Sequence, residues 1–435
     1  MRRKGLPFAD QLQVPLNRSK PILLSRHSKD SNNSMRSEPC GRAAREAISI
    51  DLESDIEWLT SATQPAQKAE GRAIRTVDLF AGCGGLSLGV KEACRRAGFE
   101  HRVEFASEWD EGAMEVFRQN FDPVHYSCED IDSILSSSHR KTPTKAEQSF
   151  LDANTNAREP DILIGGPPCQ GHSDLNNHTR RADSRNNLYF RMLRATQILS
   201  PKSVIIENVS TVIHSKERVV QRTRKLLGKM GYNVSEETLW GDHFGVPQKR
   251  KRHFLVASRV SHPDFDQLHS VRSRFRDDPR TLRWAIGDLQ EFYDEDDVFN
   301  SSSRPSTRNQ ERMDYLLDED SYDLPNEERP PCHRHGHNYP AVYGRMYWDI
   351  PSSTITAGFG STGQGRFMHP SRCIVTGRGR TLTPHEAARV QSFPDWFNFS
   401  DQRRGTLSKT IGNAVPPLLG MYVAKVALAG IIDHI

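Results

Sequence analysis

Short hydrophobic runs rich in β-branched residues alternate with stretches of helical periodicity from about residue 74 onward. Five such runs predict buried strands, at residues 74–80, 102–107, 161–166, 203–209 and 253–258. Apolar residues between them recur at helical spacing, as in Leu86, Val90, Ala93 and Ala97, and again in Leu188, Met192, Ala195 and Leu199. This alternation predicts an α/β fold with a doubly wound, mostly parallel sheet. Such sheets bind ligands at the carboxyl ends of their strands.

The N-terminal part has a different texture. Residues 1 to about 46 carry ten Lys and Arg against four acids, with many Ser and Asn and little periodicity. This composition predicts a basic, disordered arm, within an N-terminal extension that we place at residues 1–70. Three interpretations fit the arm: a phosphate-contacting tail, a solubilising extension, or a misassigned start with Met35 as the first residue.

Composition narrows the class of protein. The 435 residues are 36% hydrophobic and 26% charged, with a net charge of only +4, which is typical of a globular chain with a sizeable core. No run approaches the ~18 apolar residues of a membrane span, and no signal-peptide core is present. The seven cysteines are odd in number and form no CxxC pair, so we expect reduced thiols rather than a disulfide framework or a zinc ribbon.

The first unusual stretch is VDLFAGCGGLSLG, residues 77–89, where a predicted strand runs into glycines and then a helix. Ser87 stands where a dinucleotide fingerprint has its third glycine, so a pyrophosphate is not the expected ligand. Glu108 ends the next strand, 108 − 82 = 26 residues past Gly82, where a carboxylate can hold ribose hydroxyls. Trp109 can stack on a base. The motif favours a nucleoside, and plain turn geometry is the alternative.

The second stretch is GGPPCQGHS, residues 165–173, which presents Cys169 behind two prolines at the end of a strand. An isolated cysteine is usually a core residue, but here other strand ends carry Glu207, Arg250 and Arg252. A thiol, a carboxylate and two guanidinium groups on neighbouring strand ends predict a nucleophile, an acid and an anion clamp.

Six motifs in this order resemble those of one family. They are FAGCGG, GPPCQG, ENV, QKRKR, RTLTPHEAARVQSFPDWF (380–397) and IGNAVPPLL (411–419). The chain resembles the DNA (cytosine-5) methyltransferases, closest in pattern to bacterial members. The resemblance implies a sheet of the S-adenosylmethionine-dependent methyltransferase type with a second, smaller DNA-recognition domain. We accordingly expect a catalytic and cofactor-binding domain at 71–260, a target-recognition region at 261–400 and a C-terminal segment at 401–435 that packs back on the catalytic domain.

The resemblance implies methyl transfer from S-adenosylmethionine to carbon 5 of cytosine in double-stranded DNA. Cys169 would add to carbon 6 of a flipped-out base while Glu207 manages the proton on ring nitrogen 3. Arg250 and Arg252 would act electrostatically, one toward the cytosine oxygen and one toward the nucleophile loop or the carboxylate.

Cofactor and DNA residues follow from the same motifs. The cofactor set is Phe80, Gly82, Gly84, Gly85, Leu86, Glu108, Trp109, Asp130, Ile131, Pro168, Asn413 and Val415, with Asp130 accepting from the adenine amino group. Residues 170–187 are polar and unpatterned, which predicts a mobile loop that closes on DNA. Its candidate contacts are Gln170, Ser173, Arg180, Arg181 and Arg185.

The region from 260 to 380 is the least legible, and how it reads DNA is left open. CHRHGH at 332–337 offers one thiol and three histidines without a second pair, so we expect no metal. In the penultimate motif, Thr383, Pro384 and Glu386 predict the start of a helix with a capping box.

Two alternatives from the same superfamily remain, an RNA (tRNA) cytosine-5 methyltransferase and a catalytically silent DNA-binding relative. The Cys-Phe-Thr signature of the tRNA branch is missing, and no catalytic residue is lacking. We expect a monomer without membrane association whose partners are double-stranded DNA and, in a restriction-modification system, a cognate endonuclease. The expected location is the cytoplasm with the nucleoid in a prokaryote, or the nucleus in a eukaryote.

Overall fold

Seven strands form the central sheet in the part of the chain that the structure describes. The computed structural model describes residues 52–66, 72–136, 142–168, 188–215, 218–334, 341–399 and 402–432. The sheet has the order β3-β2-β1-β4-β5-β8-β6. Its strands are β1 (Ile74–Leu79), β2 (His101–Ser107), β3 (His125–Ser127), β4 (Ile162–Gly165), β5 (Ser203–Val209), β6 (Asn233–Trp240) and β8 (Lys251–Ser258). The first five in the order pair in parallel, and β8 pairs antiparallel with both β5 and β6. The predicted doubly wound, mostly parallel sheet is confirmed.

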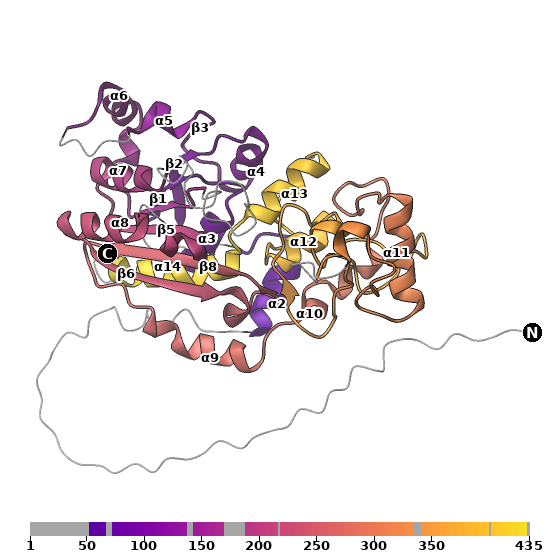
Figure 1. Cartoon of the computed structure of the whole chain (residues 1–435). Coiled ribbons are helices and arrows are strands. Elements are labelled where there is room, and N and C mark those ends of the chain that lie inside the picture. Colours follow the sequence, from indigo (N-terminus) through magenta and orange to yellow (C-terminus); the bar gives the residue numbers. More distant parts are fainter. Residues whose placement is uncertain are drawn as a thin grey trace, which may run out of the picture. The chain divides into compact units, whose positions relative to one another are not determined.

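Helices cover both faces of this sheet (Figure 1). On one face, Ile164, Ile205 and Val256 belong to the same core cluster as residues of α3 (Gly85–Arg96) and α14 (Pro417–Ile432). The intervening residues Leu163, Val204 and Leu255 point to the other face and join a second cluster with α7 (Tyr189–Leu199) and α8 (Val219–Lys229). Because alternate side chains of a strand face opposite sides, a sheet covered on both faces needs the continuous hydrophobic runs seen in the sequence.

The other described helices surround this core or build the second half of the chain. They are α2 (Leu52–Thr60), α4 (Glu111–Phe121), α5 (Ile131–Ile134), α6 (Lys145–Ala153), α9 (His269–Asp277), α10 (Leu282–Ile286), α11 (Thr307–Asp318), α12 (Pro384–Val390) and α13 (Arg404–Asn413). All described residues lie in one compact unit that spans residues 40–435.

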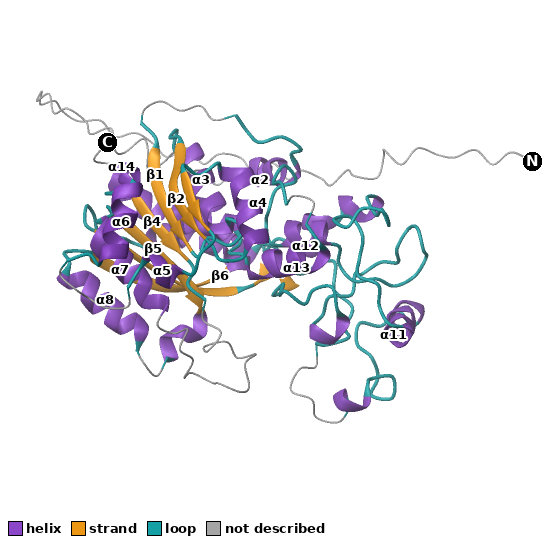
Figure 2. Ribbon diagram, turned by 90° about the horizontal axis from the view of Figure 1, so that it is seen from above, coloured by secondary structure: helices purple, strands orange, loops and turns teal. Residues whose placement is uncertain are grey.

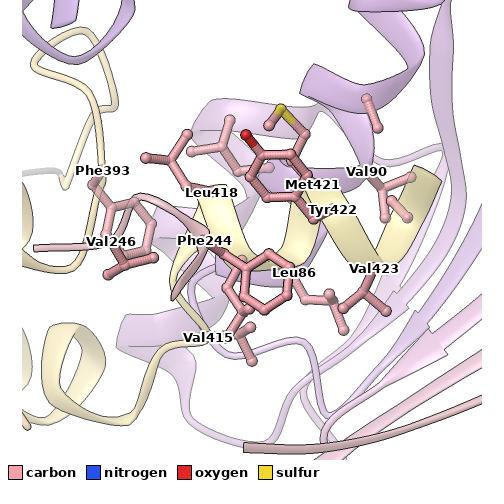
Figure 3. Close-up of a cluster of buried hydrophobic side chains, with 14 of the residues drawn as sticks. Leu86, Val90, Phe244, Val246, Phe393, Val415, Leu418, Met421, Tyr422 and Val423 are labelled. Atoms are coloured by element: carbon pink, nitrogen blue, oxygen red, sulfur yellow. The ribbon is translucent and has the colours of Figure 1, made fainter. Parts of the chain in front are cut away.

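The last helix packs closely on the first helix after the glycine loop. A side chain at Gly89 of α3 would overlap the backbone of α14 at Gly420 and Met421, so the glycine permits the close approach. Figure 3 shows the side chains that fill this contact: Leu86 and Val90 from α3, Val415, Leu418, Met421, Tyr422 and Val423 from the C-terminal segment, and Phe244, Val246 and Phe393 beside them. The segment Arg404–Ile432 is long and apolar enough to cross a membrane, but 83% of its most apolar window is buried inside the protein.

Helix α2 lies inside the stretch that the sequence assigned to the N-terminal extension. Trp58 and Leu59 are buried in the core, and Asp55 accepts hydrogen bonds from Arg96 at 2.6 Å and Arg280 at 2.7 Å. The predicted N-terminal extension at residues 1–70 therefore includes a helix that belongs to the folded core. Nine residues carry too short a hydrophobic pattern to stand out beside a basic, irregular segment.

Few strands occur in the described part of residues 260–380, where loops connect short helices (Figure 2). One two-residue pair, β7 (Gln248–Lys249) with β9 (Ser352–Ser353), joins this region to the segment before β8. Arginines of the region pair with a run of acids on and after α11: Arg378 with Asp314, Arg372 with Asp318, Arg345 with Asp320, and Arg366 with Asp323. A small core of Met313, Leu316, Leu324 and Met368 lies beside them.

The predicted capping box of the penultimate motif is confirmed. Thr383 accepts a hydrogen bond from the backbone of Glu386, and the Glu386 carboxylate accepts one from the backbone of Thr383, with Pro384 at the first helical position. Glu386 also receives two hydrogen bonds from Arg380 at 2.7 Å, and these contacts hold the pKa of its carboxyl at about 2 despite burial.

Candidate active site

Glu207 lies at the carboxyl end of β5, where its side chain meets Arg252 of β8. The Arg252 Nε is 2.9 Å from Glu207 Oε1. The two groups meet because β8 runs antiparallel to β5, so that β8 begins where β5 ends, and Val209 pairs with Arg252 in the register. Burial raises the pKa of the Glu207 carboxyl, and the charges of Arg252 and Arg250 only partly oppose this rise. A carboxyl whose pKa is raised in this way holds a proton to higher pH than a solvated glutamate does, which suits it to act as a proton donor.

The loop that leaves β4 is held against the same carboxylate. The Asn208 side chain donates a hydrogen bond of 3.1 Å to the carbonyl of Pro167, which ties the end of β5 to the start of the GPPCQG loop. A Cβ placed on Gly166 would lie 3.1 Å from Glu207 Oε2, and of the described residues beyond its chain neighbours no other comes within 4 Å. Among the described residues, Gly166 therefore leaves room beside the carboxylate, where a side chain at this position would meet Glu207.

Cys169 lies two residues past Pro167 and falls outside the described residues, as do the candidate DNA contacts Gln170, Ser173, Arg180, Arg181 and Arg185. Pro168, the last described residue of this loop, is exposed.

Arg250 makes different contacts from Arg252. Its side chain is 1% exposed and donates hydrogen bonds to the backbone carbonyls of Ile355 at 2.8 Å and Gly412 at 3.1 Å. Gln248 adds a hydrogen bond to the Gln391 side chain and accepts one from the Ile355 backbone. Within the part of the chain described, Arg250 reaches Glu207 only through its charge. Its geometry is that of a clamp between β8, the segment after β9 and the end of α13, a role that the sequence did not indicate.

The glycine loop and the end of β2 form a second group beside this one. Glu108 accepts backbone hydrogen bonds from Gly82 and Asp110, both at 3.0 Å, which places its carboxylate against the glycine loop. Gly82 adopts a φ of +56°, and apart from its chain neighbours no described residue lies within 4 Å of where its Cβ would be. Phe80 also has a positive φ, of 59°, an uncommon conformation for a bulky residue. Trp109 is 72% exposed. A carboxylate, an open backbone and an exposed aromatic ring fit a nucleoside such as that of S-adenosylmethionine.

Other residues of the predicted cofactor set have packing roles. A side chain at Gly84 would overlap the ring of Phe121, and one at Gly85 would overlap the carbonyl of Val415. Leu86 and Val415 are both buried in the core. These four residues support the glycine loop on its core side, whereas a Cβ at Gly82 would meet no described residue beyond its chain neighbours.

The remaining candidates lie at the ends of two helices. Asp130 is exposed and caps α5, where its carboxylate accepts a hydrogen bond from the backbone of Asp132 at 2.9 Å. Ile131 is buried as the first residue of that helix, and Asn413 is exposed at the end of α13.

One buried carboxyl beside the glycine loop was missed from the sequence. Asp78, in the middle of the otherwise apolar end of β1, is 2% exposed and accepts a hydrogen bond of 2.7 Å from Ser87. Burial, with the nearby charge of Glu108 in the same direction, raises the pKa of Asp78 to about 8. The signal was available, because a carboxylate within a buried strand needs a local partner.

Comparison with known proteins identifies the family. Residues 74–428 match the model of the C-5 cytosine-specific DNA methylases. The chain is 44% identical over 371 residues to the type II methyltransferase M1.BsuMI of Bacillus subtilis, covering 85% of this chain and 84% of the relative. It is 29% identical over 395 residues to the type II methyltransferase M.DdeI of Desulfomicrobium norvegicum, covering 80% of this chain and 87% of the relative.

Solved structures agree on the fold. The Dnmt2 methyltransferase of S. pombe superposes with a TM-score of 0.54 at 17% identity, over 82% of this chain and 98% of the other. A prophage-encoded DNA modification methyltransferase from E. coli gives a TM-score of 0.51 at 23% identity, over 81% of this chain and 98% of the other. The predicted resemblance to bacterial members is confirmed, and S-adenosylmethionine is the methyl donor of this class. The chain belongs to the family of C-5 cytosine-specific DNA methylases.

Proposed function

We propose that the protein methylates carbon 5 of cytosine in double-stranded DNA through a covalent bond between Cys169 and carbon 6 of a flipped-out base. The observation that carries the proposal is the Glu207 carboxyl, which is buried, has a raised pKa, pairs with Arg252 at 2.9 Å and lies directly beside Gly166. The GPPCQG loop that bears Cys169 starts at this point.

The residues divide the chemistry between them. The Cys169 thiolate forms a bond to carbon 6 while Glu207 protonates ring nitrogen 3, so that negative charge does not accumulate on the ring and carbon 5 becomes nucleophilic. S-adenosylmethionine supplies the methyl group that carbon 5 takes up. Nitrogen 3 then returns its proton to Glu207, which restores the double bond to carbon 4. A base removes the carbon 5 proton, and the electron pair of that C–H bond re-forms the 5,6 double bond and expels Cys169 as the thiolate. Arg252 holds Glu207 in place, and Arg250 fixes the strand that bears Arg252.

Residues around the glycine loop would hold S-adenosylmethionine. We propose that Glu108 accepts hydrogen bonds from the ribose and that Trp109 and Asp130 contact the adenine base. Gly82 would let the backbone approach the cofactor closely. Gly84, Gly85, Leu86 and Val415 would support the loop from the core side, with Phe80, Ile131, Pro168 and Asn413 at its borders.

A base within a duplex hides carbon 6, so the target must leave the stack at a cost of a few kcal/mol. We assign to the loop at 170–187 the closure on DNA and to residues 261–400 the reading of sequence. Residues 71–260 would carry catalysis, and residues 401–435 would complete the cofactor side. The named relatives are type II methyltransferases, so we further propose action as a monomer beside a cognate restriction endonuclease that cuts the same site.

Bisulfite sequencing of unmethylated plasmid DNA after incubation with the protein and S-adenosylmethionine tests the proposal. We expect protected cytosines in one sequence context, none with Cys169→Ala, and a loss of roughly 10² to 10⁴ in rate with Glu207→Gln. Full methylation by Cys169→Ala would contradict the covalent mechanism. A wild-type protein that binds S-adenosylmethionine but protects no cytosine would refute the assignment of DNA as the substrate, and tRNA would be tested next.

A further inference from the structure

We propose that Trp240 and Lys251 form a DNA-backbone contact at the edge of the sheet. Lys251 lies within the QKRKR motif, but neither residue belongs to the predicted site. This proposal rests on the proposed function, because it takes DNA as the substrate. Trp240 is the last residue of the edge strand β6, and Lys251 is the first residue of β8 and its direct partner in the register. The Lys251 ammonium lies over the Trp240 ring, 5.0 Å from its centroid.

The position of this pair connects it with catalysis. Arg252 of β8 pairs with Val209 of β5 on one side and with Leu239 of β6 on the other. The Trp240–Lys251 pair therefore lies at the same end of the strands as Glu207. Two strand spacings amount to about 10 Å, the length of roughly three base pairs of B-DNA. A duplex whose target cytosine occupies the active site would therefore pass over this edge within a few base pairs of the target.

Exposure and charge favour a nucleic acid here. A single exposed aromatic side chain is ordinary, but Trp240 is 40% exposed beside a cation and directly follows Leu239, which is 1% exposed. Lys251 is exposed and, within the described chain, forms no salt bridge. The acids of β6 are engaged elsewhere, Glu237 with Arg272 at 2.6 Å and Glu236 with Arg224 and His253.

Two neighbours complete the surface. The His243 ring lies 6.4 Å from the Trp240 ring, and Lys249 is exposed on the strand segment before Arg250. The charge of Asp242, which is 8% exposed, acts on both of these neighbours. An exposed lysine held on an indole ring, with a histidine beside it, fits a phosphate and the adjoining sugar, because such contacts fix the register of a protein on DNA.

Salt-dependent DNA binding by the full-length protein tests this assignment. Lys251→Gln should lower the slope of log Kd against log salt concentration by about one unit, and Lys251→Arg should retain it. Lys229→Gln is the matched control, because Lys229 is exposed at the end of α8, near the opposite end of β6 from Trp240. Trp240→Ala should weaken DNA binding roughly tenfold and Trp240→Phe less, with the Kd for S-adenosylmethionine unchanged in both.

A second measurement locates the contact. Single phosphates within four base pairs of the target are replaced, one at a time, by neutral methylphosphonates. At one of these phosphates the replacement should weaken DNA binding by the wild-type protein. It should not weaken binding by Lys251→Gln any further, since that variant no longer makes the contact. Equal salt slopes for Lys251→Gln and Lys229→Gln, in a protein that methylates DNA normally, would overturn this inference alone. Absence of methylation by the wild-type protein would instead overturn the proposed function.

Discussion

Arg252 Nε lies 2.9 Å from Glu207 Oε1, and this contact joins two strands, β5 and β8, that are adjacent in the sheet but separated by β6 and β7 in the sequence. The pair is mostly buried, with 16% of the Arg252 side chain and 12% of the Glu207 side chain exposed. Even so, the pKa of Glu207 stays above its usual range, because loss of water outweighs the attraction of the two guanidinium groups. The site thus combines a carboxyl that can be protonated with a cation that orients it.

Arg252→Gln should change the pH dependence of methylation as well as its rate. The Arg252 cation opposes the effect of burial on the pKa of Glu207, so its removal should raise that pKa further. If the protonated carboxyl is the active form, the alkaline limb of kcat/KM should move to higher pH, and the rate at the optimum should fall as the carboxyl loses its orientation. Steady-state rates between pH 6 and 10 measure this shift. An alkaline limb that moves to lower pH would exclude Glu207 as the proton donor.

Arg250→Met should destabilise the fold more than Arg252→Gln does. The Arg250 guanidinium satisfies the buried carbonyls of Ile355 and Gly412, and their loss should lower the free energy of unfolding by about 3 kcal/mol. Removal of Arg252 leaves Glu207 buried, but that carboxyl can take up a proton, which limits the penalty. Urea unfolding of the two variants compares them directly. Equal stabilities would show that Arg250 is not a clamp.

Gly82→Ala and Gly85→Ala should fail in different ways. Alanine at position 82 meets open space but must hold a φ of +56°, which costs about 1 kcal/mol, and its methyl group faces the expected cofactor. We expect only a small loss of stability and a Kd for S-adenosylmethionine that rises roughly tenfold.

At position 85 the methyl group would overlap the carbonyl of Val415, which should cost about 1–3 kcal/mol of stability. Calorimetric binding and thermal unfolding of both variants separate the two effects. A stable Gly85→Ala protein with greatly weakened binding would reverse the assignment of these glycines.

Strand ends were the most predictable feature of this sequence. Hydrophobic runs place β1, β4 and β5 within one or two residues, because a strand buried on both faces has a continuous apolar pattern. The polar strand β6 was missed, since its edge position leaves Glu236 and Glu237 half-buried and removes that pattern.

Site residues were predictable as a set but not in their individual contacts. Glu207 and Gly82 follow from strand ends and turn chemistry, whereas the contacts of Arg250 involve Ile355 and Gly412, more than 100 residues away in sequence. No local pattern encodes such a contact. Asp130 illustrates the same limit, because its capping of α5 depends on where that short helix begins.

Asp78→Asn should stabilise the protein at alkaline pH. The folded-state pKa of Asp78 is raised to about 8, so its favourable contribution is fully present below the unfolded pKa, near 4, and is lost as pH rises through about 8. Asparagine has the same shape, can still accept the hydrogen bond from Ser87 and carries no charge, so the variant avoids this loss. The difference in unfolding free energy between variant and wild type should grow by about 1.4 kcal/mol per pH unit between the unfolded and folded pKa values and level off above the folded one.

Urea unfolding at pH 6, 7, 8 and 9 measures the trend, with the exposed Asp266→Asn as a control that should show none. Parallel curves for Asp78→Asn and the wild type would mean that Asp78 is ionised in the fold, and its carboxylate would then need a cationic partner in the cofactor site.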